Sequence, residues 1–112
     1  MTDHVTLEPA PRIQIRAGGQ LITDTTAGYV VHERGLPDRY YVPRADVRGE
    51  LVDGAGDGRC PWKGQWRHLD LTVAGTRIPA AAWTYGETTP VCAPIRDFIA
   101  FYPGKVDAID VG

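Results

Sequence analysis

The sequence has little of what marks several specialised classes of protein. Its 112 residues carry a formal net charge of −2, with a pI near 5.8. Domains that bind nucleic acid are usually strongly basic, so the sequence predicts no nucleic-acid partner. No apolar run approaches the roughly 20 residues that a membrane span requires, and the polar start Met1–His4 lacks the regions of a secretory signal. We therefore expect a cytoplasmic protein with no membrane partner.

Cysteine and histidine are also scarce. Cys60 and Cys92 are the two cysteines, and His4, His32 and His68 are the three histidines. Two thiols do not form the dense disulfide framework of a small secreted domain. A structural zinc site needs four ligands, commonly in closely spaced pairs, and the sequence has no such spacing. The sequence therefore predicts no metal site and no cofactor.

The glycine-rich segment 53–59 fails two tests for a ligand-binding loop. Counted from Asp53 as an EF-hand, it has Ala55 at the third position and Gly64 at the twelfth, where a bidentate glutamate belongs. The phosphate-binding pattern needs a Gly-Lys pair, but here Lys63 precedes Gly64. We expect this segment to be a flexible loop between two strands.

Alternation of apolar and polar residues with a period of two is the abundant signal. It predicts strands over residues 12–16, 20–24, 28–33, 39–42, 67–73, 77–85 and 98–102. The one credible helical turn lies at Pro43–Arg48, where a proline begins it. Short strands separated by turn residues predict a single all-β domain over residues 12–112, an antiparallel open sandwich. Residues 1–11 are expected to be a flexible leader that packs weakly.

Five short motifs occur in a fixed order along the chain. They are Ile22–Thr25, Tyr40–Pro43, Cys60–Gly64 (CPWKG), Ala81–Tyr85 (AAWTY), and Ile99–Tyr102 followed by Val106-Asp107. Together they resemble the bacterial domain-of-unknown-function 427 family over nearly the whole chain, from about Ile13 to Asp107. Trp62 replaces a commoner tyrosine or phenylalanine, and Pro103 stands where an aromatic or aspartate is often found.

The resemblance implies a β-tent-like fold of antiparallel sheets, shared with methionine sulfoxide reductase B and the thalidomide-binding domain of cereblon. Several such relatives have a four-cysteine zinc knuckle, which this chain lacks. The family has sometimes been labelled nucleotidyltransferase-like. The sequence has none of the acidic metal-binding pattern that this chemistry needs, so we expect no such activity.

A first candidate site is a reactive thiol. Lys63 follows Cys60 by three positions in a turn bounded by proline and glycine. A nearby cation raises the thiolate fraction, so Cys60 would be the nucleophile, Lys63 its electrostatic partner and His68 the proton carrier. Cys92 would serve as the resolving thiol if the chemistry were methionine sulfoxide reduction. The alternative is that Cys60 is a small buried hydrophobic residue.

A second candidate site is a pocket lined by aromatic rings. Its members would be Trp62, Trp83, Tyr85 and Tyr102, with Lys63 available for an anion. Such rings suit a flat or cationic ligand. Relatives of the cereblon type bind ligands in a tryptophan cage, which supports this interpretation by analogy. The alternative is that these rings belong to the hydrophobic core.

Three classes of function follow from these sites. We favour a small-molecule-binding domain whose pocket lies around Cys60–Gly64 and Trp83–Tyr85. The first alternative is a thiol-dependent enzyme centred on Cys60. The second is a structural or interaction protein, because exposed edge strands of an antiparallel sheet would allow a homodimer to form.

Overall fold

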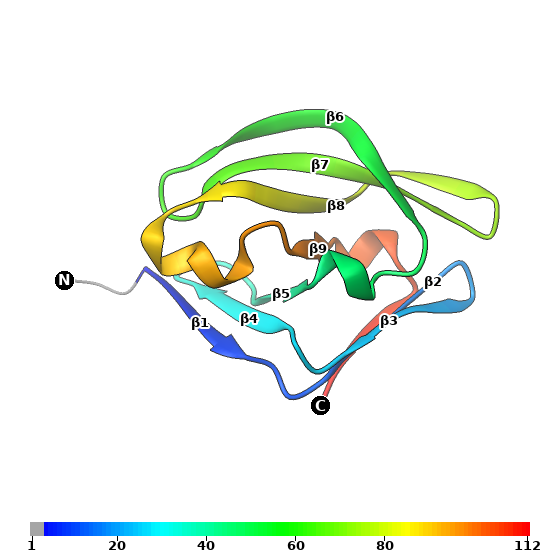
Figure 1. Cartoon of the computed structure of the whole chain (residues 1–112), viewed down its shortest axis with the longest axis horizontal. Helices are drawn as coiled ribbons and strands as arrows, with labels where there is room; N and C mark the ends of the chain where they lie inside the picture. The colour runs from blue at the N-terminus through cyan, green and yellow to red at the C-terminus, as the bar shows by residue number, and fades with distance from the viewer. Residues whose placement is uncertain (1–3) are drawn as a thin grey trace.

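A computed structural model of the chain describes residues 4–112, and β-strands dominate this part (Figure 1). The strands are β1 (Val5–Pro9), β2 (Ile13–Ala17), β3 (Gln20–Thr25), β4 (Tyr29–Glu33), β5 (Arg39–Val42), β6 (Glu50–Cys60), β7 (Gly64–Val73), β8 (Thr76–Thr88), β9 (Ile99–Phe101) and β10 (Ala108–Val111). The predicted all-β class is confirmed. Between residues 4 and 112, no helix has the length and apolar character that crossing a membrane requires.

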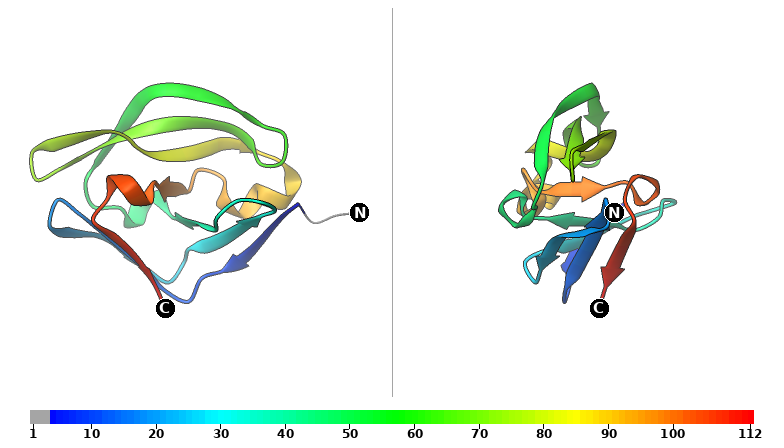
Figure 2. Two further views of the ribbon diagram at one scale, coloured as in Figure 1. Left: turned by 180° about the vertical axis from the view of Figure 1, so that it is seen from behind. Right: turned by 90° about the vertical axis from the view of Figure 1, so that its right-hand side faces the viewer.

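The strands form two antiparallel sheets. Seven strands pair in the order β1-β4-β5-β9-β8-β7-β6, and three pair in the order β10-β2-β3. The long strands β6, β7 and β8 arch over the short strands β5 and β9, while β1, β4 and the smaller sheet lie on the other side (Figure 1). The end-on view in Figure 2 shows the same separation. The larger sheet is therefore bent at β5 and β9.

Two hydrophobic clusters fill the interior. The aliphatic core consists of buried residues from the smaller sheet and from β5, β7, β8 and β9, with Ala10 beside them: Ala10, Ile13, Ile15, Ala17, Ile22, Val42, Leu69, Leu71, Val73, Ala81, Ala82, Ile99 and Phe101. The aromatic core lies on the opposite side of β8 and contains Val5, Val31, Tyr41, Trp83, Tyr85, Cys92, Ile95 and Ala100. Ala82 thus belongs to one core and Trp83 to the other, as the alternation along a strand requires.

The segment expected to be a flexible leader contains a strand. Residues 5–9 form β1, which pairs with β4 from Val5 opposite Glu33 to Pro9 opposite Tyr29. Val5 is buried in the aromatic core, and Leu7 packs against that core. Because these side chains bury apolar surface and the backbone completes a ladder, the expectation of a weakly packed leader is corrected for residues 5–9. For residues 1–3, it lies outside the described residues.

The glycine-rich segment is also a strand, so the prediction of a loop is wrong. Residues 53–59 lie within β6, which pairs with β7 and has an irregularity in register between Asp53 and Asp57. A β-carbon at Gly58 would lie 2.8 Å from the ring of Trp66. At Gly54 it would collide with the Asp70 carboxylate. The glycines therefore let side chains of β7 lie over the backbone of β6. In the sequence, the same run of glycines has the composition of a loop.

Three short 3₁₀ segments connect the strands: η1 (Arg44–Asp46), η2 (Pro90–Ile95) and η3 (Pro103–Lys105). The first is the helical turn predicted at Pro43–Arg48. The sequence predicted at most one, whereas η2 and η3 are additional. Both begin at a proline, whose fixed φ is compatible with the first position of a helical turn.

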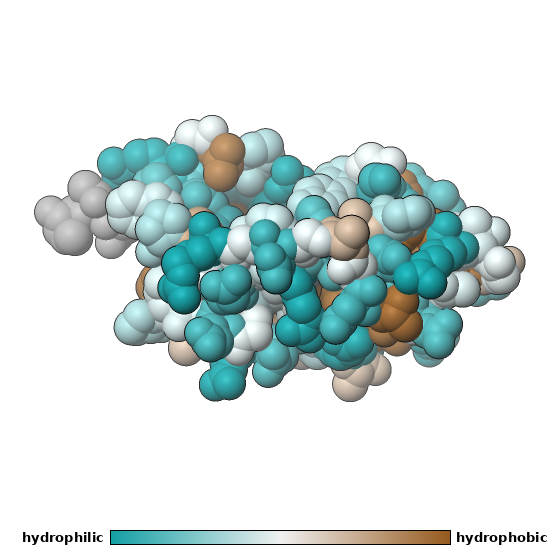
Figure 3. All heavy atoms as spheres, turned by 90° about the horizontal axis from the view of Figure 1, so that it is seen from above, coloured by the Kyte–Doolittle hydropathy of each residue, from teal (hydrophilic) through white to brown (hydrophobic). Residues whose placement is uncertain are grey.

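The surface is mainly polar. Figure 3 shows a largely hydrophilic face, with the hydrophobic residues in separate spots. Among residues 4–112, the large hydrophobic side chains that are exposed are Leu36, Trp62, Val91 and Val111. Two of these, Leu36 and Trp62, lie close to the candidate site.

Candidate functional site

The turn between β6 and β7 determines where Lys63 lies. The Lys63 amide donates to the carbonyl of Cys60 at 3.2 Å and closes a four-residue turn. At Gly64 the backbone has a φ of 132°, and a β-carbon there would collide with the carbonyl oxygen of Glu87. Thr89 donates from its amide to the Lys63 carbonyl at 3.0 Å. The CPWKG motif is therefore a tight turn fixed against the end of β8, and it directs the Lys63 side chain inward.

Lys63 forms an ion pair with Glu33, the last residue of β4. The Lys63 Nζ lies 2.5 Å from the Glu33 Oε1, and the two side chains are only 11% and 9% exposed. The other carboxylate oxygen of Glu33 lies 3.4 Å from the Nε2 of His4. Each oxygen of this buried carboxylate therefore has a basic group beside it, and Lys63 compensates its charge.

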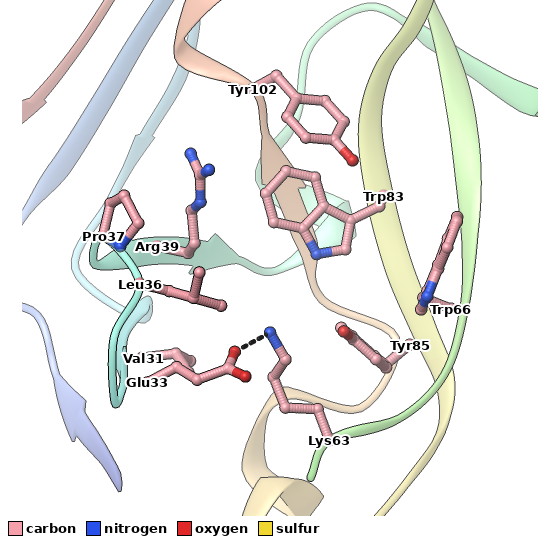
Figure 4. A pocket seen from close by; sticks show the side chains of 10 residues that line it. All are labelled: Val31, Glu33, Leu36, Pro37, Arg39, Lys63, Trp66, Trp83, Tyr85 and Tyr102. Carbon is pink, nitrogen blue, oxygen red and sulfur yellow. Dashed lines mark ion pairs between the residues drawn. The ribbon is translucent and has the colours of Figure 1, made fainter. Parts of the chain in front are cut away.

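The ion pair lies at one side of a cavity of about 210 Å³. The cavity opens between the β4–β5 connection and strands β7 and β8, and its lining side chains point toward a common space (Figure 4). These side chains are Val31, Glu33, Leu36, Pro37, Arg39, Lys63, Trp66, Trp83, Tyr85 and Tyr102. Leu36 is more than half exposed, so it lies at the rim.

Trp83 is fixed from several sides. Its Nε1 donates to the Tyr41 hydroxyl at 2.9 Å, and the ring of Tyr102 lies 4.4 Å away, centroid to centroid. The guanidinium of Arg39 lies 5.6 Å from the Trp83 ring centroid. Arg39 forms no ion pair within residues 4–112. The cavity therefore combines an aromatic wall, in which a hydrogen bond to Tyr41 holds Trp83, with a cation that has no acidic partner among residues 4–112.

Burial controls the ionisation of the groups around this wall. Desolvation raises the pKa of Tyr85 well above the ordinary value, and it does the same to the pKa of Tyr41. Both hydroxyls therefore stay neutral in the physiological range. Burial likewise raises the pKa of Cys92, so its thiol stays protonated there.

The structure brings together four of the residues predicted for the aromatic pocket: Lys63, Trp83, Tyr85 and Tyr102 line the cavity. Trp62 does not line it. Its ring stacks on His4 instead, with centroids 4.0 Å apart and planes 21° apart, and it is 49% exposed. The reason is the turn, which points Lys63 inward and its neighbour outward.

The residues predicted for thiol chemistry are not all brought together. Cys60 is half-buried at the end of β6 and packs against the aromatic core, which also contains Cys92; both thiols are free. Cys60 lies opposite Gly64, and His68 lies four residues farther along β7. At about 3.4 Å per residue, Gly64 and His68 are about 14 Å apart along the strand. Catalytic roles for Cys60, Lys63 and His68 stay a prediction.

His68 instead supports the wall of the cavity. Its Nε2 lies 3.0 Å from the Tyr102 hydroxyl, and its Nδ1 lies 3.1 Å from the carbonyl oxygen of Ala55. Since Tyr102 lines the cavity and His68 does not, His68 is a positioning residue for that ring. The glycines of β6 make room for this imidazole, because a β-carbon at Gly56 would lie 3.1 Å from its Nδ1.

Sequence reasoning missed Glu33 and Arg39, which contribute two of the three charged side chains in the cavity lining. Residues 33–37 contain a glycine and a proline, a signal for a turn that places flanking side chains at one edge. Nothing in the chain spacing shows that this edge faces β8. Within the described part of the chain, no three His, Cys, Asp or Glu side chains are grouped as a metal site would need.

Comparison with known proteins identifies a family. A family model described as "Domain of unknown function (DUF427)" matches residues 6–112. The match extends the motif region by including most of β1. A comparison with curated proteins finds no match.

Proposed function

The chain belongs to the DUF427 family, and we propose that it is a small-molecule-binding domain whose ligand occupies the cavity beside Trp83. The observation that carries this proposal is the cavity itself, in which the rings of Trp83 and Tyr85 lie beside the buried ion pair of Lys63 and Glu33. Aromatic walls with a few polar groups among them are typical of ligand sites.

The size and walls of the cavity suit a small flat molecule. At about 210 Å³ it is below the roughly 300–1,000 Å³ that drug-sized ligands occupy. The rings of Trp83 and Tyr102 offer apolar surface, while Lys63 and Glu33 supply a donor and an acceptor at one end. A few polar groups among aromatic walls are typical of ligand sites.

The tryptophans provide an internal test. Trp66 and Trp83 line the cavity, whereas Trp62 does not. We would record the three indole N–H signals by NMR while titrating a library of flat fragments with and without charge. Binding in the cavity should shift the signals of Trp66 and Trp83 and leave that of Trp62 in place. Absence of any shift and of any thermal stabilisation across the library would overturn the proposal.

A pair of tyrosine variants would separate binding from folding. Tyr102→Leu removes a ring beside Trp83, and Tyr40→Leu removes one that packs against the aliphatic core away from the cavity. We expect Tyr102→Leu to weaken the affinity of a fragment hit at least fivefold, and Tyr40→Leu to leave it unchanged. Equal effects from the two variants would point to a general loss of stability instead.

The thiol-dependent enzyme has less support from the geometry. The Lys63 ammonium is engaged by Glu33, and both ring nitrogens of His68 lie within hydrogen-bond distance of other groups. The pH dependence of alkylation, followed by peptide mass mapping, tests this alternative, with buried Cys92 as the slow reference. A midpoint for Cys60 well below about 8.5, the value of a free thiol, would favour the enzyme. Slow alkylation of Cys60 would contradict the thiol-dependent enzyme.

A further inference from the structure

Resting on the proposed function, we infer that the cavity selects a small aromatic ligand bearing a single carboxylate, which Arg39 binds. Two observations outside the aromatic wall support this. One is the balance of charges around the cavity. The other is the guanidinium of Arg39, which forms no ion pair within residues 4–112.

The charges that line the cavity sum to +1. Arg39 and Lys63 are the cations, and Glu33 is the anion. The other carboxylate oxygen of Glu33 lies 3.4 Å from the Nε2 of His4. Because Glu33 already compensates Lys63, Arg39 is the uncompensated charge. A ligand with one negative charge would make the occupied site neutral, which is the arrangement that burial favours.

Arg39 has the donors that a carboxylate needs. Its guanidinium presents N–H groups in a planar fork that matches two carboxylate oxygens, and no acidic side chain within residues 4–112 pairs with it. It lies over the Trp83 ring, beside Pro37 and Leu36 (Figure 4). A carboxylate bound there would place the attached ring of the ligand among apolar side chains. The ligand's charge and its ring would thus be recognised at adjacent places.

Glu33 would also exclude ligands with a second negative charge. Its carboxylate is buried on the same cavity, where interactions between charges are less screened than in water. A phosphate monoester or a dicarboxylate would bring two charges near this group. A monocarboxylate bound at Arg39 need bring only one, so the cavity should prefer the monoanion.

Four probes with the same ring test the inference: benzoate, phenyl phosphate, benzylamine and benzyl alcohol. Each would be titrated into the full chain at pH 7 and low salt, with the indole signals as the readout. We expect benzoate to bind at least tenfold more tightly than each of the other three. Tighter binding of phenyl phosphate, or equal binding of benzyl alcohol, would overturn the inference while leaving a ligand cavity in place. Binding of none of the four would also overturn it, and the wider fragment library would then decide the proposed function.

Variants of one arginine make the test specific. Arg39→Gln should abolish the preference for benzoate over benzyl alcohol, and Arg39→Lys should retain part of it because the charge remains without the fork. Arg34→Gln is the matched control: it removes one positive charge from the connection that precedes β5, but Arg34 is exposed and does not line the cavity. Thermal unfolding would verify that each variant folds. An unchanged preference in Arg39→Gln, or an equal loss in Arg34→Gln, would contradict the role of Arg39.

Discussion

The aliphatic core and the aromatic core lie on opposite sides of the same strand, yet they are built differently. Ile13, Ile15, Leu69 and Leu71 of the aliphatic core are at most 1% exposed, and no residue of that core lines the cavity. The aromatic core contributes Val31, Trp83 and Tyr85 to the cavity wall. The side chains on one side of β8 thus take no part in the cavity wall, whereas those on the other side form part of it.

The buried carboxylates of the two regions differ in the same way. Asp70, beside the aliphatic core, accepts from the Ala80 amide at 2.8 Å and from Arg77 at 2.7 and 3.0 Å. Glu33, beside the aromatic core, has Lys63 next to one carboxylate oxygen and His4 next to the other. The pair of Lys63 and Glu33 lines the cavity, whereas Asp70 and Arg77 do not.

The largest effect is expected from Leu69→Ala. Leu69 is fully buried in the aliphatic core, so its truncation loses apolar burial and leaves a cavity. We expect the free energy of unfolding to fall by about 4 kcal/mol, measured by urea denaturation. Ligand affinity in the aromatic cavity should be unchanged under conditions where the variant is folded. A loss below about 1 kcal/mol would show that this side of β8 is loosely packed as well.

The next effect should come from breaking the ion pair of the aromatic core. Lys63→Met removes the ammonium beside Glu33 and leaves a buried carboxylate whose remaining ionic contact, among residues 4–112, is His4. We expect a loss of about 3 kcal/mol in the free energy of unfolding. The double variant Lys63→Met/Glu33→Gln should recover most of this loss, because no uncompensated charge remains. Equal stability of single and double variants would mean that the pair is not a coupled unit.

The sequence predicted several of the side chains that β8 and the CPWKG turn direct toward the aromatic core. Alternation along β8 places Trp83 and Tyr85 on one face, which is a local property of a strand and can be read without a structure. The CPWKG motif likewise marked Lys63 through turn residues that determine the local backbone. These features depend on neighbours within a few positions, so the sequence was sufficient for them.

The positions of Glu33 and Arg39 at the cavity depend instead on how distant strands meet. Glu33 and Arg39 reach the cavity because the larger sheet bends, bringing the β4–β5 connection opposite β8. No local pattern encodes that bend. The same limit explains the error over residues 53–59: glycine indicates a loop when only its own flexibility is considered. In β6 its role is to leave room for the side chains of Trp66 and Asp70 on the next strand.

A smaller, pH-dependent effect should come from Asp70. The hydrogen bond from the Ala80 amide, followed by that from Arg77, holds the pKa of this carboxyl below its ordinary value. Its contribution to stability is therefore present above the ordinary pKa of about 4 and is lost as the pH falls through the lower folded-state value.

Urea denaturation of the parent protein and of Asp70→Asn at pH 7 and at pH 3 would measure this contribution. The parent should be the more stable at pH 7, and the difference should shrink at pH 3. The comparison with Asp70→Asn is necessary because Arg12 also lowers the pKa of Asp24, which adds its own acid dependence. A difference that is the same at both pH values would mean that the Asp70 charge does not contribute.

The smallest effect is expected from Trp62→Ala. Trp62 is half exposed and stacks on His4 outside the cavity, so its loss removes one solvent-accessible ring contact. We expect the free energy of unfolding to fall by less than about 1 kcal/mol, and the affinity for a fragment bound beside Trp83 to stay the same. Urea denaturation and the indole signals of the remaining tryptophans would measure both.

The contrast with Trp83 makes this small effect informative. Both residues lie in family motifs, and the sequence alone assigned both to one pocket. If Trp62→Ala weakened fragment binding as much as Tyr102→Leu, the stack of Trp62 on His4 would have to transmit its effect through the contact of His4 with Glu33. His4→Ala would then weaken binding equally. Without that coupled loss, Trp62 holds the beginning of β1 against the turn, and recognition of the ligand is confined to the inward-facing side of the CPWKG motif.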